Sequence, residues 1–441
     1  MSSLREAIES AAPGIWRAAA DVERDIAGYD LGRAAGIVEP TSTNHVARIV
    51  ACAREHRVPL SIVGARTAYW RALSFEGALV VDTRGLDAIG EVEPGVIAVG
   101  AGALVRSVHD ALDARGHSLI AHPDAYGDGT VGAMVATAMS SGIGMGRADE
   151  ELVRGLEVVL GTGEVVATGA SRALGAGDFA RAGLPDPTSL FVGAQGALGI
   201  VTSVALRTVT KRPRAALRWT PAGTGVVVRA AVELAADLAR CGEYDTLRLE
   251  LKAEGGPPRS EATLIVDAPF GEAELALRIE HAKRLIRERF GGEPVTATRE
   301  PARFWGEPEE HAAAFAGAHL RGIDVVIGYA EAAAAVERLG ALFQTAPATR
   351  SFRVALYFAP RYVNVGVHAV FAAGDLAAAD RFADQVRASL GELRHVPYRW
   401  SRDWDALAGP RLDAGYRALM DDLKRRCDPD GILMPGASLW P

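Results

Sequence analysis

Polar side chains gather on one predicted strand in the second half of the chain, Tyr362–Phe371. Successive residues of a strand point to opposite faces, so Tyr362, Asn364 and His368 share one face. This pattern is unusual for a purely structural strand, and a histidine there could take a proton from a substrate hydroxyl. A lone histidine is more often structural, and that interpretation stays open. The candidate catalytic residues in and near this strand are Tyr357, Arg361, Tyr362, His368 and Arg399.

Glycine-rich loops in the first half give a second chemical signal. Ser61–Ala68 leaves a predicted strand through small residues, where consecutive backbone N–H groups form a concave anion site. The loop His122–Ala133 leads into a helix of small residues at Met134–Met139. Small residues let a phosphate chain approach the backbone, and the N-terminus of a helix favours negative charge. Ser140–Gly146 again offers free amides, although each loop taken singly could be an ordinary turn.

Several familiar classes of site are disfavoured. The chain has neither a GxxxxGK(S/T) motif nor a strand followed by GxGxxG, so a P-loop or Rossmann site is not expected. Its 441 residues carry a net charge of −7, which provides no chain-wide basic footprint for nucleic acid. Cys52, Cys241 and Cys427 lie far apart, which argues against a zinc site or a disulfide framework and fits a reducing compartment. No apolar run of about 18 residues predicts a membrane span, and no signal peptide is visible.

The elements that must position these residues fall into two groups. Up to about residue 210, short apolar runs alternate with helices and glycine turns, which indicates an α+β region. Helices are predicted at Asn44–His56, with Thr43 or Asn44 as N-cap, and at Val105–Arg115. Gly161–Gly163 predicts a hairpin turn. The predicted strands are Val58–Val63, Ala78–Asp82, Val96–Val99, Leu156–Leu160, Glu164–Thr168 and Gly199–Val209.

The pattern changes after Lys211–Pro213. Long amphipathic helices are predicted at Glu272–Phe290, Ala330–Phe343 and Leu376–Leu390. Strand pairs bridged by such helices indicate a separate domain, an antiparallel sheet with helices on one face. A last helix, Ala414–Arg426, ends at a strong turn signal. The predicted strands of the second group are Thr246–Leu251, Ala262–Asp267, Val325–Ile327, Arg353–Phe358 and Tyr362–Phe371.

Six ordered segments carry a family resemblance. They are Val38–Thr43, Pro59–Ala68, Pro123–Thr137, Gly155–Gly169, Leu190–Thr202 and Asp428–Gly436. In this order they resemble the flavin-binding fold of the vanillyl-alcohol oxidase / p-cresol methylhydroxylase family, which includes the glycolate and D-lactate dehydrogenase flavoproteins. The resemblance covers about residues 36–210 and 414–441. The closing Leu439–Pro441 resembles the branch of the family that oxidises phenols.

The resemblance implies FAD as the cofactor and a fold of the α+β class. This fold has a two-subdomain FAD-binding part of the vanillyl-alcohol oxidase type and an antiparallel-sheet cap with helices on one face. The FAD-binding domain would span residues 1–210, the cap or substrate domain 211–410, and a C-terminal return to the FAD-binding domain 411–441. The implied cofactor-binding residues are Gly64, Ala65, Arg66, Thr67, Ala68, Pro123, Asp124, Gly129, Thr130, Gly132, Ala133, Thr137, Ser140, Gly142, Gly196, Gly199, Ile200 and Val201.

The sequence also departs from the family pattern. The loop Gly64–Ala68 lacks the histidine that some members bond to the flavin, so we expect non-covalent FAD. A covalent bond from a residue of the cap stays open. Arg66 could pair with a phosphate or be an exposed loop arginine, and Gln195 stands where relatives often carry Glu. The acidic lead-in to the Asn-x-His strand of the glycolate and lactate dehydrogenases is absent, so no metal site is predicted.

The activity that the resemblance implies is hydride transfer from a small alcohol or 2-hydroxy acid to flavin N5. A base would take the hydroxyl proton, and a cation such as Arg399 would fix the anionic end, unless Arg399 is a solvated loop residue. Oxidation of para-substituted phenols with 4-hydroxybenzylic substrates is the alternative, and a non-catalytic FAD-binding protein is another. The acceptor would be oxygen or an electron carrier. A cytoplasmic location is expected, the resemblance allows a homo-oligomer, and Tyr416–Arg417 is expected on a helix surface.

Overall fold

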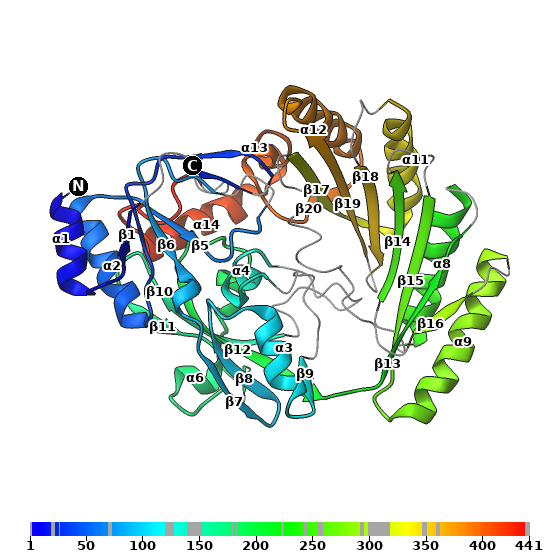
Figure 1. The fold of residues 1–441 in the computed structure, drawn as a ribbon, viewed down its shortest axis with the longest axis horizontal. Coiled ribbons are helices and arrows are strands. Elements are labelled where there is room, and N and C mark those ends of the chain that lie inside the picture. The colour runs from blue at the N-terminus through cyan, green and yellow to red at the C-terminus, as the bar shows by residue number, and fades with distance from the viewer. Residues whose placement is uncertain are drawn as a thin grey trace.

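The protein folds into two lobes that lie side by side (Figure 1). The chain builds the first lobe up to β12 (Ile200–Thr210), crosses to the second lobe, and returns to the first with α14 (Ala414–Cys427). The computed structural model describes residues 2–18, 23–25, 27–68, 73–119, 128–138, 152–178, 180–181, 183–221, 225–241, 246–253, 259–291, 295–298, 318–345, 351–358 and 362–436.

The first lobe begins with a small four-stranded sheet in the order β1-β4-β6-β5, whose last three strands are parallel. The amphipathic pattern of α2 buries Val46, Ile49 and Val50 against it. The predicted N-cap is wrong by one residue. Ser42 caps the helix, because its extended backbone lets Oγ accept the N–H of His45 at 3.2 Å. The elements are α1 (Ser2–Ala11), β1 (Trp16–Arg17), β4 (Gly36–Val38), α2 (Thr43–His56), β5 (Leu60–Val63), β6 (Leu79–Asp82) and the 3-10 turn η1 (Thr83–Gly85).

A second sheet of the first lobe runs in the order β11-β10-β12-β8-β7, with β9 paired to β12. The predicted hairpin is confirmed, since β10 and β11 are antiparallel neighbours. A separate strand pair joins β2 (Glu23–Arg24) to β3 (Asp30–Gly32). The other elements are β7 (Ile89–Glu93), β8 (Val96–Gly100), α3 (Val105–Asp113), β9 (His117–Leu119), α4 (Val131–Ala136), β10 (Val153–Val159), β11 (Val165–Ala167), α6 (Ala170–Ala173), α7 (Thr188–Phe191) and β12 (Ile200–Thr210).

The second lobe is one antiparallel sheet in the order β16-β13-β15-β14-β18-β19-β17-β20, and its long helices cover the outer face (Figure 1). This confirms the predicted architecture. The helix α8 and the strand β13 were not predicted. The elements are β13 (Arg214–Trp219), α8 (Gly225–Cys241), β14 (Thr246–Ala253), β15 (Arg259–Asp267), α9 (Glu272–Phe290), β16 (Thr296–Thr298), β17 (Ala318–Gly328), α11 (Tyr329–Thr345), β18 (Ser351–Phe358), β19 (Tyr362–Ala372), α12 (Leu376–Gly391) and β20 (His395–Pro397).

The two lobes have separate hydrophobic cores. Buried residues between Leu4 and Leu206 join Cys427, Ile432 and Leu433 in the first core. The second core contains buried residues between Ala215 and Ala408. The chain links the two through α13 (Arg402–Ala408), the 3-10 turn η2 (Gly409–Arg411) and α14 (Ala414–Cys427).

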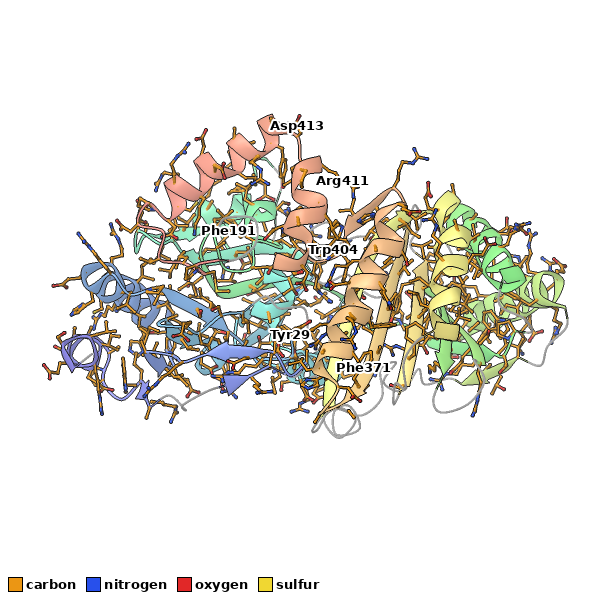
Figure 2. The ribbon with its side chains drawn as sticks, turned by 90° about the horizontal axis from the view of Figure 1, so that it is seen from above. Tyr29, Phe191, Phe371, Trp404, Arg411 and Asp413 are labelled. Carbon is orange, nitrogen blue, oxygen red and sulfur yellow. The ribbon has the colours of Figure 1, made fainter. Side chains whose placement is uncertain are left out.

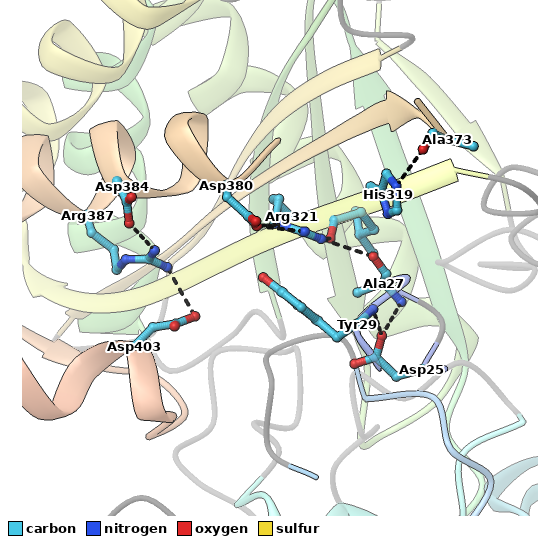
Figure 3. A network of polar contacts seen from close by, with 11 residues as sticks. Asp25, Ala27, Tyr29, His319, Arg321, Ala373, Asp380, Asp384, Arg387 and Asp403 are labelled. Atoms are coloured by element: carbon cyan, nitrogen blue, oxygen red, sulfur yellow. Dashed lines mark hydrogen bonds and ion pairs between the residues drawn. The ribbon is translucent and has the colours of Figure 1, made fainter. Parts of the chain in front are cut away.

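A buried arginine of the cap sheet joins the second lobe to the first lobe (Figure 3). Arg321 on β17 is 1% exposed and donates to the carbonyl oxygen of Ala27 at 3.0 Å. Its guanidinium lies 4.0 Å from the ring centroid of Tyr29 and donates to Asp380 at 2.7 and 2.9 Å. Asp25 holds this turn by accepting the N–H groups of Ala27 and Tyr29, both at 2.9 Å. On the opposite face of the sheet, Ala318 and Leu320 of β17 and Val370 of β19 pack against Ala27 and Tyr29. The uncovered face of the cap sheet therefore points toward the first lobe.

Candidate active site

A cavity of about 960 Å³, open mouth included, lies in the first lobe. The cavity brings together most of the predicted cofactor-binding residues: Gly64, Arg66, Thr67, Ala68, Gly129, Thr130, Gly132, Ala133, Thr137, Gly196, Gly199 and Val201.

The remaining predicted cofactor residues lie elsewhere. Ile200 is fully buried in the core of the first lobe, and Ala65 is half-buried in its loop and does not line the cavity. Pro123, Asp124, Ser140 and Gly142, like the candidate catalytic residue Arg361, fall outside the described residues. Lining residues that were not among the predicted ones are Ile62, Val63, Leu73, Thr83, Met134, Ala136, Phe191, Gln195 and Met434.

Glycine lets the loops of this cavity approach one another. A Cβ atom on Gly64 would lie 2.2 Å from Oγ1 of Thr130, and one on Gly132 would lie 2.9 Å from the carbonyl oxygen of Ala101. Both separations are below van der Waals contact, so side chains at these positions would push the loops apart. Glycine at these two positions is therefore required by the packing of the loops.

Strained backbone concentrates around the same cavity. Three of the five non-glycine residues with positive φ in the described part of the chain line it: Arg66 (58°), Gln195 (52°) and Met434 (46°). Such conformations cost about 1–3 kcal/mol each and persist where the surroundings hold them. Met434 is held by backbone and side chain, because its N–H donates to Leu60 at 2.8 Å and its Sδ accepts the N–H of Ile62 at 3.0 Å.

A buried ion pair fixes the C-terminal return beside the cavity. The ammonium of Lys424 donates to Asp428 at 2.6 Å and to the carbonyl oxygens of Ala197 and Leu433 at 2.9 and 3.1 Å. The other contacts of the Asp428 carboxylate are the N–H groups of Ile432 and Leu433. This clamp sets the backbone that leads into Met434, a lining residue whose contact no local pattern in the sequence indicated.

Arg66 lines the cavity and is 27% exposed, so it is not a freely solvated loop residue. Its Nη2 lies 3.8 Å from Oδ2 of Asp82, and its guanidinium lies 5.5 Å from the ring centroid of Phe75. Asp82 also binds Arg84 through two hydrogen bonds of 2.9 and 2.6 Å. The cavity therefore has a cation at its wall that is held in place from behind.

The inner face of the cap sheet carries the polar residues predicted to share a strand face. On β19, Val363, Val365 and Val367 pack into the helix-covered core, so the residues between them point to the other side. His368 lies opposite Arg353 on β18, and Asn364 lies opposite Tyr357. Asn364 is 5% exposed, and its Oδ1 has no hydrogen-bond partner among the described residues.

His368 stands between a guanidinium and a carboxylate. Its Nδ1 is 3.2 Å from Nη2 of Arg353, and its Nε2 is 3.4 Å from Oδ1 of Asp324. A guanidinium only donates, so Nδ1 is the acceptor and Nε2 carries the proton. Burial lowers the pKa of His368, and Arg353 and Arg399 lower it further while Asp324 opposes them. His368 is thus a neutral imidazole near pH 7, as a general base must be.

The charge of Arg353 is balanced by a buried carboxylate. Nη1 of Arg353 lies 3.3 Å from Oε1 of Glu250 on β14. Glu250 also pairs with Arg248 and, at 2.9 Å, with Lys252. The guanidinium of Arg248 lies 5.5 Å from the ring centroid of Tyr357. Lys252 also pairs with Glu261 at 3.1 Å, so each of these three cations has an acidic partner.

Arg399 belongs to the same face. It is 9% exposed, so it is not the solvated loop cation that was one alternative. Its Nη1 is 3.8 Å from Oδ2 of Asp324, and its guanidinium is 4.6 Å from the ring centroid of Tyr398. Trp400, which follows Arg399, connects the cap to the cavity, because its carbonyl oxygen accepts a hydrogen bond from Nε2 of Gln195 at 2.7 Å.

Tyr29 and Trp404 lie at the junction of the two lobes (Figure 2). By contrast, Tyr416 and Arg417 are exposed on α14, as predicted. The described residues contain no group of three His, Cys, Asp or Glu side chains that could hold a metal ion. Within the same ranges, no helix is long and apolar enough to cross a membrane.

Comparison with protein families identifies the class of the first lobe. Residues 34–169 match the family described as FAD binding domain. The protein therefore carries an FAD binding domain, and FAD is its cofactor. The residues present fit that group, since the lining of the cavity combines loops that pack closely through Gly64 and Gly132 with one cation, Arg66.

Two curated proteins are related in sequence over part of the chain. A D-lactate dehydrogenase of Anaerostipes hadrus is 30% identical over 195 residues, which are 42% of this chain and 38% of that protein. A glycolate oxidase subunit, GlcD, of Bacillus subtilis (strain 168) is 29% identical over 187 residues, 40% of this chain and 37% of that protein. The match thus spans less than two-fifths of either relative.

Solved structures match the whole fold. A 4-ethylphenol oxidase from Gulosibacter chungangensis aligns with a TM-score of 0.79 and 16% identity, over 100% of this chain and 97% of that one. The p-cresol methylhydroxylase structure aligns with a TM-score of 0.79 and 13% identity, over 100% and 96%. At these identities the likeness concerns the fold alone, which is that of the vanillyl-alcohol oxidase type, as predicted.

Proposed function

We propose that the protein is an FAD-dependent oxidoreductase that takes a hydride from the C2 atom of a small 2-hydroxy acid. The observation that carries this proposal is the pairing of Arg353 with His368, whose Nη2 and Nδ1 atoms are 3.2 Å apart on the cap face. When bound, FAD supplies the hydride acceptor. The cap supplies the groups that bind and deprotonate the substrate.

A 2-hydroxy acid matches this pair because its carboxylate and hydroxyl are on adjacent carbons. The carboxylate accepts from Arg353, a charge-assisted contact that replaces the hydrogen bond to the imidazole. Nδ1 of His368 is then free to take the hydroxyl proton as the C2–H bond breaks. Arg399 adds a second cation to the same face and favours an anionic substrate.

The sequence relatives support the same substrate class. The two curated proteins that match over the FAD-binding part are a D-lactate dehydrogenase and a glycolate oxidase subunit. Both names describe oxidation of a 2-hydroxy acid. The electron acceptor in this proposal is oxygen or an electron carrier. Rapid return of the yellow colour of the reduced flavin in air would indicate oxygen, and slow return would indicate an electron carrier.

Para-substituted phenols are the second candidate class. Arg399 lies beside Tyr398, and together with Tyr357 these residues could hold a phenolate ring. The solved structures with the same fold include a 4-ethylphenol oxidase and p-cresol methylhydroxylase. In such substrates the oxygen and the reacting carbon lie at opposite ends of a ring, so the pairing of Arg353 with His368 would have no role.

Anaerobic bleaching of the flavin distinguishes these possibilities. The holoprotein is mixed with D-lactate, glycolate, p-cresol or 4-ethylphenol, and the flavin absorbance is followed. Bleaching by a 2-hydroxy acid, with little by the phenols, is expected. Bleaching by phenols alone would overturn the proposed substrate class. A protein that stays yellow with every donor would be a non-catalytic FAD-binding protein.

A further inference from the structure

A glycine in the middle of β19 opens a space between two strands. Gly366 lies opposite Asp324 of β17 and two residues before His368. A Cβ atom at this position would lie 2.5 Å from Oδ1 of Asp324 and 3.0 Å from Cε1 of His368. Glycine weakens the interior of a strand, and it is found there where other groups must approach closely. At Gly366 the approaching groups are a carboxylate and an imidazole.

Asp324 uses this space to contact two functional side chains at once. Oδ1 faces Nε2 of His368 at 3.4 Å, and Oδ2 faces Nη1 of Arg399 at 3.8 Å. All three side chains are largely buried. The carboxylate therefore touches the proposed base from the side opposite Arg353.

We propose that Asp324 is the positioning residue of the site: it holds His368 as the Nε2–H tautomer, stabilises the imidazolium formed when Nδ1 takes the substrate proton, and orients Arg399. This inference rests on the proposed function. In the step, the O–H bond of the hydroxy acid breaks and an Nδ1–H bond forms, while the C2 hydride leaves to FAD. Asp324 gains no proton, since it acts through His368.

The charge around His368 comes from several strands. Arg353 and Arg399 oppose protonation of the imidazole, and Asp324 is the one carboxylate among the charged groups that act on it in the described part of the chain. Behind Arg353 lie the further charged groups of β14: Arg248, Glu250 and Lys252. Removing the charge of Asp324 should therefore lower the pKa of His368, because an opposite charge within about 4–6 Å shifts a pKa by about 1–3 units.

The direct test is nitrogen-15 NMR of histidine-labelled holoprotein, in which the signal of His368 is the one that disappears in His368→Gln. Wild-type protein should show a proton on Nε2. In Asp324→Asn the pKa of His368 should fall by about 1–3 units. The matched control is Asp380→Asn, which removes a carboxylate from α12 of the same lobe and should leave the His368 signal unchanged. A wild-type proton on Nδ1, or an unchanged pKa in Asp324→Asn, would overturn the proposal.

Gly366→Ala provides an independent variant, because it alters no titratable group. The added methyl should displace the Asp324 carboxylate and lower the pKa of His368 as Asp324→Asn does. If Gly366→Ala does not fold, the pKa of His368 in Asp324→Asn is the measurement that tests the proposal. In flavin reduction by a 2-hydroxy acid, the acid limb of the rate profile should move to lower pH in Asp324→Asn. A wild-type protein that no 2-hydroxy acid bleaches would refute the proposed function, while the NMR result would still decide on Asp324.

Discussion

The two lobes contribute different kinds of chemical groups to the candidate site. Of the residues that line the cavity in the first lobe, Arg66 is the one with a charge, and close packing depends on glycines such as Gly64 and Gly132. The inner face of the cap sheet is instead a continuous set of paired charges from Arg248 to Arg399. In the function that we propose, shape and backbone hold the cofactor, whereas the charged groups of the cap bind and deprotonate the substrate. A substitution in one lobe should therefore leave the proposed role of the other lobe, FAD binding or flavin reduction, unchanged.

In the function that we propose, the first lobe alone holds FAD. Gly64–Ala68 contains no histidine. Cys427 lies in the hydrophobic core of the first lobe and Cys52 packs against that core, and neither lines the cavity. Acid precipitation should accordingly release all of the FAD into the supernatant, where its absorbance is measured. Yellow colour that remains with the pellet would show a covalent bond, and mass spectrometry of flavin-bearing peptides would reveal whether the cap provides it.

The largest kinetic effect is expected from the cap. His368→Ala removes the proposed base and should slow anaerobic flavin reduction by about 10²–10⁴-fold. FAD affinity should stay at the wild-type value, because the phosphate loops lie in the other lobe. Stopped-flow reduction measures the first quantity, and fluorescence titration of the apoprotein with FAD measures the second. Wild-type reduction in a folded His368→Ala would move the search for the base to Tyr357 or Tyr362.

A substitution in the first lobe should instead change FAD affinity and leave the rate of flavin reduction unchanged. We expect Arg66 to make a charge-assisted contact to the FAD phosphates worth about 1.5–3 kcal/mol, so Arg66→Ala should lower FAD affinity by roughly tenfold or more. At saturating FAD the reduction rate should equal that of the wild type. Arg84→Ala is the matched control, since Arg84 binds the same Asp82 but is half exposed. An Arg66→Ala variant with unchanged affinity would leave Arg66 without a role in cofactor binding.

A smaller effect, on the free energy of unfolding, is expected at the junction of the two lobes. Burial raises the pKa of Asp25 to about 6, against the opposing N–H groups of Tyr29 and Ala27 and the charge of Arg321. The folded state then binds a proton more tightly than the unfolded state, so the free energy of unfolding falls as pH rises from about 4 to about 6. The loss is at most about 3 kcal/mol.

Asp25→Asn removes this cost and keeps an oxygen that can accept the same N–H groups. Its melting temperature should exceed that of the wild type at pH 7, and the difference should disappear near pH 4. Asp30→Asn, at an exposed position of β3, serves as the control and should change little at either pH. A lower melting temperature of Asp25→Asn at pH 7 would mean that the ionised carboxylate stabilises the turn.

Local patterns predicted most elements of the fold. The helix α9 has the predicted bounds, Glu272–Phe290, because its amphipathic run is enclosed by Gly271 and Gly291. The family resemblance of the six ordered motifs, rather than a local pattern, implied 12 of the residues that line the cavity. Contacts between distant strands had no local signal. Asp324 reaches His368 only through the register of β17 and β19, and Met434 reaches the cavity only through its pairing with Leu60.

The central claim is that Arg353 binds the carboxylate of a 2-hydroxy acid while His368 takes its hydroxyl proton. The most direct test is anaerobic flavin reduction by D-lactate or glycolate, followed over substrate concentration in wild type, Arg353→Gln and His368→Ala. The account predicts that Arg353→Gln weakens apparent substrate binding by roughly tenfold or more. It also predicts that His368→Ala lowers the limiting rate at saturation. Identical curves for all three proteins, or reduction by p-cresol and 4-ethylphenol alone, would contradict it.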